Sequence, residues 1–168
     1  MRALSILALV LFSGCVFNNV SAEETLRDSV LGLNGEVRWN RLDLASQRVA
    51  PAFRLQFRRT HADWHHGFEI ADHEVVEVAV ADEDRARATS FVTFRWYDMH
   101  TMLLEETTVR QEWRRGINGY SLVSEAVTDG NERLLEVPER LRPEEDVEDD
   151  EDEDEDVPEE PTTLAALE

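Results

Sequence analysis

Residues 88–97 read Ala-Thr-Ser-Phe-Val-Thr-Phe-Arg-Trp-Tyr, and their side chains fall into two alternating sets. We assign one set, Val92, Phe94 and Trp96, to the core, because successive side chains of a strand point to opposite faces of a sheet. The other set contains Phe91, Arg95 and Tyr97. This period of two predicts a central β-strand with one face turned towards the interior.

Three further strand-like segments surround the central one. After Gly67, valines recur at every second position as far as residue 80, and an acidic turn at residues 82–84 follows. Residues 101–114 and 120–127 alternate in the same way, and the Gly-Ile-Asn-Gly stretch between them is typical of a hairpin connection. Short connections predict a consecutive, antiparallel four-stranded sheet.

Three helices are predicted before the sheet, at residues 23–40, 42–49 and 51–67. Ser21 followed by Glu24 resembles a capping box at the first of them. The apolar stripe of that helix is formed by Leu26, Val30, Leu33 and Val37. Helices followed by a strand meander predict an α+β fold, in which the N-terminal helices pack on one face of the sheet.

This order of elements resembles the nuclear transport factor 2-like, or cystatin-like, cone fold. The resemblance spans residues 23–127 and rests also on the stretches Glu-Val-Arg-Trp at 36–39 and Thr-Val-Arg-Gln-Glu-Trp at 108–113. The chain looks closer still to uncharacterised proteobacterial lipoproteins of this shape. The resemblance implies a folded domain over residues 23–140 but no particular reaction.

The N-terminus carries an export signal over residues 1–14, in which Arg2 precedes an apolar run of about ten residues. That run is too short to span a bilayer, which takes about twenty residues. Leu-Phe-Ser-Gly-Cys at 11–15 resembles the lipobox of bacterial lipoproteins. The resemblance implies cleavage before Cys15 and acylation, including palmitate, on that residue. The alternative is an ordinary secretory signal that contains a cysteine by chance.

Acylation of Cys15 would attach the chain to a membrane. Two or more acyl chains hold a protein firmly, whereas one holds it only marginally. Residues 15–22 form a tether that reaches at most about 25 Å. Val16, in place of an aspartate, favours sorting to the outer membrane of the bacterial envelope, facing the periplasm or the cell surface. Cys15 is the single cysteine, so no disulfide forms.

The charge of the chain is concentrated near its C-terminus. The net charge is -20, and residues 144–160 contain fourteen acids and no base. We expect residues 141–168 to be a disordered acidic tail, because like charges cannot collapse around a core. The tail could act as a solubilising brush, a weak calcium binder or a lure for a basic partner. No basic patch suits a phosphate backbone, so nucleic acid is excluded as the expected partner.

Histidines form the one cluster with the character of a metal site. On the predicted third helix, His61 and His65 have the i, i+4 spacing that places two imidazoles on one face. Zinc needs at least three protein ligands, and His66 points about 100° away, so no metal is predicted. His61 also lies beside Phe57 and Trp64 on the helical wheel. It is either a hydrogen-bonded core histidine or the lining of a ligand pocket.

Tyr97 and Asp98 invite comparison with cone-fold isomerases, but adjacent strand residues point to opposite faces. A nucleophile elbow, a phosphate loop and an HExxH motif are absent from the sequence. We therefore predict no catalytic residue and no cofactor. The preferred function is a non-catalytic envelope binding module, with a protein partner or a homodimer formed through the sheet face. The alternative is a small-molecule carrier or enzyme, and the ligand-binding candidates are His61, Arg95 and Tyr97.

Overall fold

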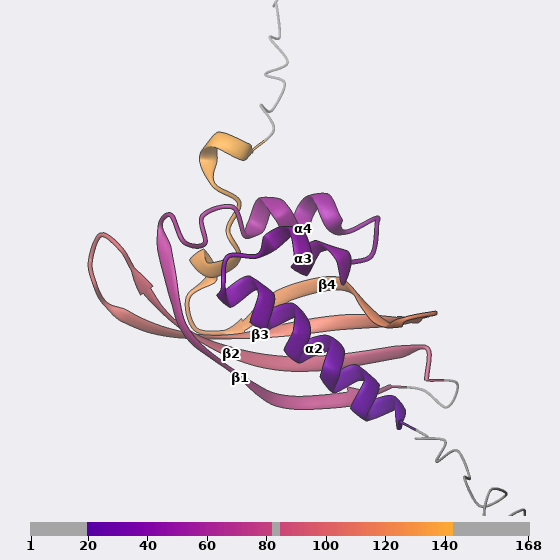
Figure 1. Ribbon diagram of the computed structural model, residues 1–168. Coiled ribbons are helices and arrows are strands. Elements are labelled where there is room, and N and C mark those ends of the chain that lie inside the picture. The colour runs from indigo at the N-terminus through magenta and orange to yellow at the C-terminus, as the bar shows by residue number, and fades with distance from the viewer. Residues whose placement is uncertain (1–19, 82–84, 143–168) are drawn as a thin grey trace, which may run out of the picture.

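The computed structural model describes residues 20–81 and 85–142 and confirms the predicted α+β architecture (Figure 1). The helices are α2 (Ala22–Arg38), α3 (Leu42–Gln47) and α4 (Arg54–Thr60). The strands are β1 (Phe68–Val80), β2 (Arg87–Asp98), β3 (Leu104–Gly116) and β4 (Gly119–Asp129), and two short 3-10 helices follow, η1 (Glu132–Leu135) and η2 (Glu139–Leu141). Cys15, the predicted signal, the predicted turn at 82–84 and the acidic run at 144–160 lie outside the described residues. No helix within them is long and apolar enough to cross a membrane.

Helix α2 begins and packs as its sequence predicts. The Ser21 side chain accepts a hydrogen bond from the backbone N–H of Glu24, with an Oγ to N distance of 3.0 Å. This bond satisfies one of the N–H groups that a helix start leaves free. The four residues of the predicted stripe are at most 1% exposed, namely Leu26, Val30, Leu33 and Val37. The helix ends two residues early, and Asn40 then takes a positive φ of 56°.

The prediction that the third helix extends to Gly67 is wrong, because α4 ends at Thr60. Trp64 bonds to the carbonyl of His61, only three residues back, and His65 has a φ of 64°, which no α-helix accommodates. Trp64 is still buried, and its indole N–H donates to the carbonyl of Leu134 at 2.8 Å. The turns after α4 therefore bring Trp64 into the core without a helix.

The sheet has the predicted consecutive, antiparallel order β1-β2-β3-β4. A two-residue turn joins β3 to β4, and Gly119 at its end has a φ of 111°, a conformation that favours glycine. Val92, Phe94 and Trp96 are at most 2% exposed, which confirms their assignment to the core. In Figure 1, α2, α3 and α4 lie on one side of the sheet, and no described element covers the other side.

Three fully buried tryptophans fill the space between the helices and the sheet: Trp64, Trp96 and Trp113. Each indole N–H has an acceptor. Trp96 donates to Thr107 Oγ1 at 3.1 Å, and Trp113 donates to Ser90 Oγ at 2.9 Å. Because a buried N–H without an acceptor costs about 1–3 kcal/mol, these bonds let bulky aromatic residues fill the core without that penalty.

Candidate functional site

A β-bulge in β4 turns a glutamate towards the helices. Val123 is an extra residue between the pairs that Leu122 and Ser124 form with β3. Beyond it, Glu125 lies opposite Gln111, which is buried in the core. Strict alternation from Leu122 would have placed Glu125 on the uncovered face, because one inserted residue reverses the face of all that follow.

The Glu125 side chain is only 2% exposed, and its nearest basic group is His61. The distance from Glu125 Oε1 to His61 Nδ1 is 3.4 Å. However, Nδ1 lies closer to the carbonyl oxygen of Phe57, at 2.8 Å, so the Nδ1 proton is donated there. Among the described residues, Oε1 of Glu125 consequently has no hydrogen-bond partner.

Packing fixes the orientation of His61. Its ring lies between those of Phe57 and Trp64, with centroid distances of 4.2 and 4.3 Å. The Thr60 hydroxyl adds a polar contact to Nδ1 at 3.1 Å. The structure thus places His61 in the core as a hydrogen-bonded histidine and also beside a buried acid.

Burial keeps both groups uncharged at neutral pH. It raises the pKa of the Glu125 carboxyl to about 8, and the nearby Thr60 and Gln111 side chains oppose part of this rise. Burial also lowers the pKa of His61 to about 4, partly opposed by its bond to the Phe57 carbonyl. A low-dielectric environment disfavours the charged form of either group, so the two groups do not form an ion pair.

Glu125 lies at an open cleft of about 580 Å³ between α4, β4 and η1. Phe53, Val127 and Leu135 supply apolar surface, whereas Gln56 and two further glutamates supply polar groups. Volumes of about 300–1,000 Å³ are typical of small-molecule sites. The cleft therefore combines apolar surface with one buried, unsatisfied carboxyl oxygen.

A chain of buried polar groups holds the inner side of this site. Asn34 and Gln111 exchange two amide hydrogen bonds, of 3.1 and 2.9 Å. The Ser90 hydroxyl donates to the same Gln111 oxygen at 3.3 Å and accepts from Trp113. These bonds link α2 to the sheet and fix Gln111 opposite Glu125.

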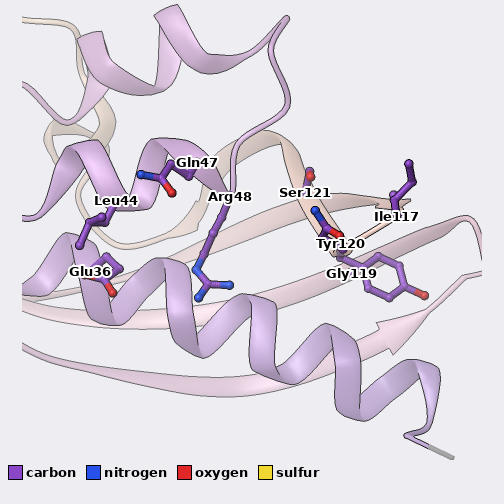
Figure 2. Close-up of a pocket in the computed structure, with 10 residues that line it drawn as sticks. Glu36, Leu44, Gln47, Arg48, Ile117, Gly119, Tyr120 and Ser121 are labelled. Atoms are coloured by element: carbon purple, nitrogen blue, oxygen red, sulfur yellow. The ribbon is translucent and has the colours of Figure 1, made fainter.

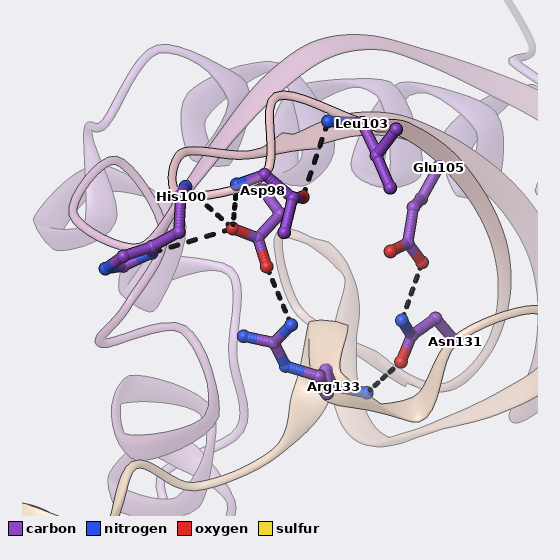
Figure 3. A network of polar contacts seen from close by, with 7 residues as sticks. Asp98, His100, Leu103, Glu105, Asn131 and Arg133 are labelled. Carbon is purple, nitrogen blue, oxygen red and sulfur yellow. Dashed lines mark hydrogen bonds and ion pairs between the residues drawn. The ribbon is translucent and has the colours of Figure 1, made fainter.

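A second polar network fixes η1, which forms one side of the cleft (Figure 3). Asp98 accepts the backbone N–H groups of His100 and Thr101, at 2.8 and 3.2 Å, and pairs with Arg133 of η1 at 2.7 Å. The His100 N–H bond, followed by the Arg133 bond, lowers the pKa of Asp98 to about 2. Asp98 therefore stays ionised and anchors η1 to the end of β2.

Arg95 and Tyr97 lie on the uncovered face of the sheet, so the structure does not bring them together with His61. Arg95 Nε is 3.0 Å from Glu106 Oε2, and its guanidinium nitrogens lie 3.8–3.9 Å from carboxylate oxygens of Asp72 and Glu74. These acids, Glu106 foremost, raise the pKa of Arg95 further. Its charge is compensated within the chain.

The predicted pairing of His61 and His65 on one helix face is wrong, because α4 ends before both. His65 contacts the carbonyl of Val37 through Nε2 at 3.1 Å and Glu69 through Nδ1 at 3.2 Å. Within residues 20–81 and 85–142, no group of three or more His, Cys, Asp or Glu residues could hold a metal ion.

A second cleft, of about 460 Å³, lies between α2, α3 and the β3–β4 turn (Figure 2). Arg48 points from the end of α3 towards α2, where Gly32 leaves room for its guanidinium. Glu36 lines this cleft and its Oε2 is buried, but unlike Glu125 Oε1 that oxygen is ion-paired with Arg41, whose Nε lies 2.6 Å away. A substitution at this second cleft therefore serves as a control in tests of the first cleft.

Sequence reasoning missed Glu125, which is the central residue of the site. The only signal was a lone acid among the apolar and small residues Leu-Val-Ser-Glu-Ala-Val at 122–127. Its inward orientation depends on the bulge, and a bulge is a property of strand pairing rather than of one strand.

No protein-family model matches this chain, and no curated protein matches it. Among solved structures, it is similar to a SEC-C motif-containing protein from Rhodopseudomonas palustris, with 12% identity and a TM-score of 0.48, over 57% of this chain and 73% of that one. It is also similar to the intermembrane space region of the chloroplast protein ARC6, with 14% identity and a TM-score of 0.45, over 62% of this chain and 95% of that one.

Proposed function

We propose that this protein is a lipid-anchored, non-catalytic binding module of the bacterial envelope that holds a ligand in the cleft beside Glu125. The observation that carries this proposal is the buried carboxyl oxygen Oε1 of Glu125, which has no hydrogen-bond partner among the described residues, on a residue that lines an open cleft. Buried polar atoms are almost always hydrogen-bonded, and an exception calls for an explanation. A bound ligand that donates a hydrogen bond provides one.

Binding rather than catalysis is favoured by the state of His61. A general base must be free to accept a proton from the reacting group. The His61 ring is held between two aromatic rings, and its Nδ1 proton is donated to the Phe57 carbonyl. The ring does not contribute to the lining of the cleft. The pair of His61 and Glu125 thus lacks the direct proton path that an acid–base catalyst uses.

The proposed anchor rests on the lipobox-like stretch at residues 11–15. With acyl chains on Cys15, the tether to α2 would hold the domain within about 25 Å of the bilayer. A ligand of the cleft would then come from the membrane surface or the adjoining periplasm.

The test is recovery of the ligand with the protein. The full protein is extracted from its native membranes in mild detergent and denatured, and the released small molecules are identified by mass spectrometry. Gln56→Trp fills the cleft from an exposed position of α4, and Gln47→Trp makes the same change at the second cleft. We expect the wild type and Gln47→Trp to release the same compound, and Gln56→Trp to release none. Equal recovery from all three proteins, or from none, contradicts the proposal.

A second candidate function is self-association through the uncovered face. Arg95 lies among Asp72, Glu74 and Glu106, next to the half-buried ring of Tyr97. A face with charges of both signs can be self-complementary across a twofold axis. Sedimentation of the unlipidated Cys15→Ser chain should then show a dimer that Arg95→Glu dissociates. A monomer at high micromolar concentration rules this out.

A further inference from the structure

The charges around the cleft indicate which kind of ligand it accepts. Three of its described lining residues are acids, all of them glutamates: Glu125, Glu132 and Glu136. Glu136 is paired with Arg142, whereas Glu132 forms no ion pair with a described residue. No arginine or histidine side chain contributes to the described lining. An anionic ligand would therefore meet acids and no compensating cation.

The apolar lining sets the second requirement. Phe53, Val127 and Leu135 line the same cleft as the buried carboxyl. A ligand that fills it needs an apolar body, because removal of apolar surface from water supplies about 25 cal/mol per Å². It also needs a donor at one end that reaches Oε1 of Glu125.

From this arrangement, and resting on the proposed ligand site, we infer that the cleft binds an organic ammonium ion with a compact apolar body. The ammonium N–H donates to Glu125 Oε1, and the apolar body contacts Phe53 and Leu135. Glu125 enters the complex as a carboxylate, so its proton leaves to solvent as the N–H···O bond forms. The carboxyl O–H bond of Glu125 is the one covalent bond broken, its proton passes to water or buffer, and the ligand keeps its charge.

Whether the Glu125 carboxyl is ionised depends on the charges of the groups that face it. His61 and Thr60 contact it from the α4 side, Gln111 from β3, and the acids of η1 and its C-terminal neighbour line the cleft. None of these groups carries a positive charge at neutral pH in the free protein. An ammonium ion would supply the missing positive charge and favour the ionised carboxyl. Affinity should therefore weaken about tenfold for each pH unit below pH 8.

The experiment compares three probes of similar size on the full protein in phosphatidylcholine nanodiscs: phenethylamine, 2-phenylethanol and 3-phenylpropionate. Isothermal titration calorimetry at pH 7, in two buffers with different ionisation heats, gives the affinity and the number of protons released. We expect binding of the amine alone, with release of close to one proton. Glu125→Gln should weaken binding about tenfold or more and abolish the release. Glu77→Gln, the same substitution at an exposed residue of β1, should alter neither.

The outcomes separate this inference from the proposed function. Equal binding of all three probes, or binding of the amine without proton release, overturns the ammonium inference. In either case, if Gln56→Trp still removes the compound recovered from membranes, the proposed ligand site stands without the ammonium inference. Absence of binding by every probe overturns the ammonium inference as well. If, in addition, no compound is recovered from membranes, both the ammonium inference and the proposed ligand site are overturned.

Discussion

Replacement of Glu125 by glutamine should change how the stability of the domain depends on pH. Glu125 has a folded-state pKa of about 8, raised by burial from its ordinary value of 4.5. A group with a raised folded pKa favours the folded state at low pH, and that contribution is lost as pH rises from the unfolded to the folded value. Burial lowers the pKa of His61 from 6.5 to about 4. Its contribution to stability therefore has the opposite pH dependence and is lost as pH falls.

The two effects cancel between pH 4.5 and 6.5, because the folded and unfolded states there bind the same number of protons at these two sites. Above pH 6.5 only Glu125 contributes, and the free energy of unfolding falls by about 1.4 kcal/mol per pH unit. From pH 6.5 to 8 the expected loss is therefore about 2 kcal/mol. Glutamine has the same size and cannot ionise, so Glu125→Gln should remove this loss.

The assay is urea unfolding of the Cys15→Ser chain, followed by tryptophan fluorescence at pH 5.5, 6.5, 7.5 and 8. The quantity compared is the difference in unfolding free energy between Glu125→Gln and the parent chain, because the other carboxylates contribute equally to both. Because His61 titrates in both chains, that difference should change from pH 5.5 upwards by about 1.4 kcal/mol per pH unit, and by about 3 kcal/mol in total at pH 8, in favour of the variant. Glu77→Gln is the control. A difference independent of pH would refute the reasoning, since Glu125 would then ionise as freely in the folded chain as in the unfolded one.

Three further changes test other parts of the structure. Gly35→Ala should stabilise the domain by about 0.5–1 kcal/mol in the same urea assay, because an added Cβ meets nothing within 4 Å and alanine favours the helix. Gly130→Ala should destabilise it by about 1–3 kcal/mol or more, because φ is 91° and the Cβ would lie 2.8 Å from Cα of Thr107. Arg133→Ala should free η1 from Asp98, seen as faster amide exchange at residues 132–135 and as weaker ligand binding, while exchange in α2 stays unchanged. Cys15→Ser should move the protein out of the membrane fraction, and its retention there would contradict the lipid anchor.

The sequence predicts the parts of the fold that depend on local periodicity. The apolar stripe from Leu26 to Val37 and the alternation around Phe94 are visible in one segment at a time, because helices and strands have fixed side-chain periods. Where an element ends depends on contacts from elsewhere. Trp64 leaves the helical path to reach the carbonyl of Leu134, seventy residues away, and no local pattern around residue 60 encodes that contact.

The candidate site was only half predictable for the same reason. His61 could be placed near the core from its position beside Phe57. Its acidic neighbour, Glu125, could not be placed there from the sequence. The orientation of Glu125 depends on the bulge at Val123, which exists only relative to β3. The uncovered position of Arg95 was predicted, but the three acids that compensate its charge come from two other strands.

The central claim is that a buried, uncharged Glu125 receives the ligand. The most direct measurement is carbon NMR of the full protein labelled with 13C at the glutamate carboxyls, titrated from pH 4 to 9. We predict one resonance with a midpoint near pH 8 that is absent from Glu125→Gln and moves to lower pH when phenethylamine is added. If every glutamate of the wild-type protein titrated near pH 4.5, with or without the amine, the account of this site would be contradicted.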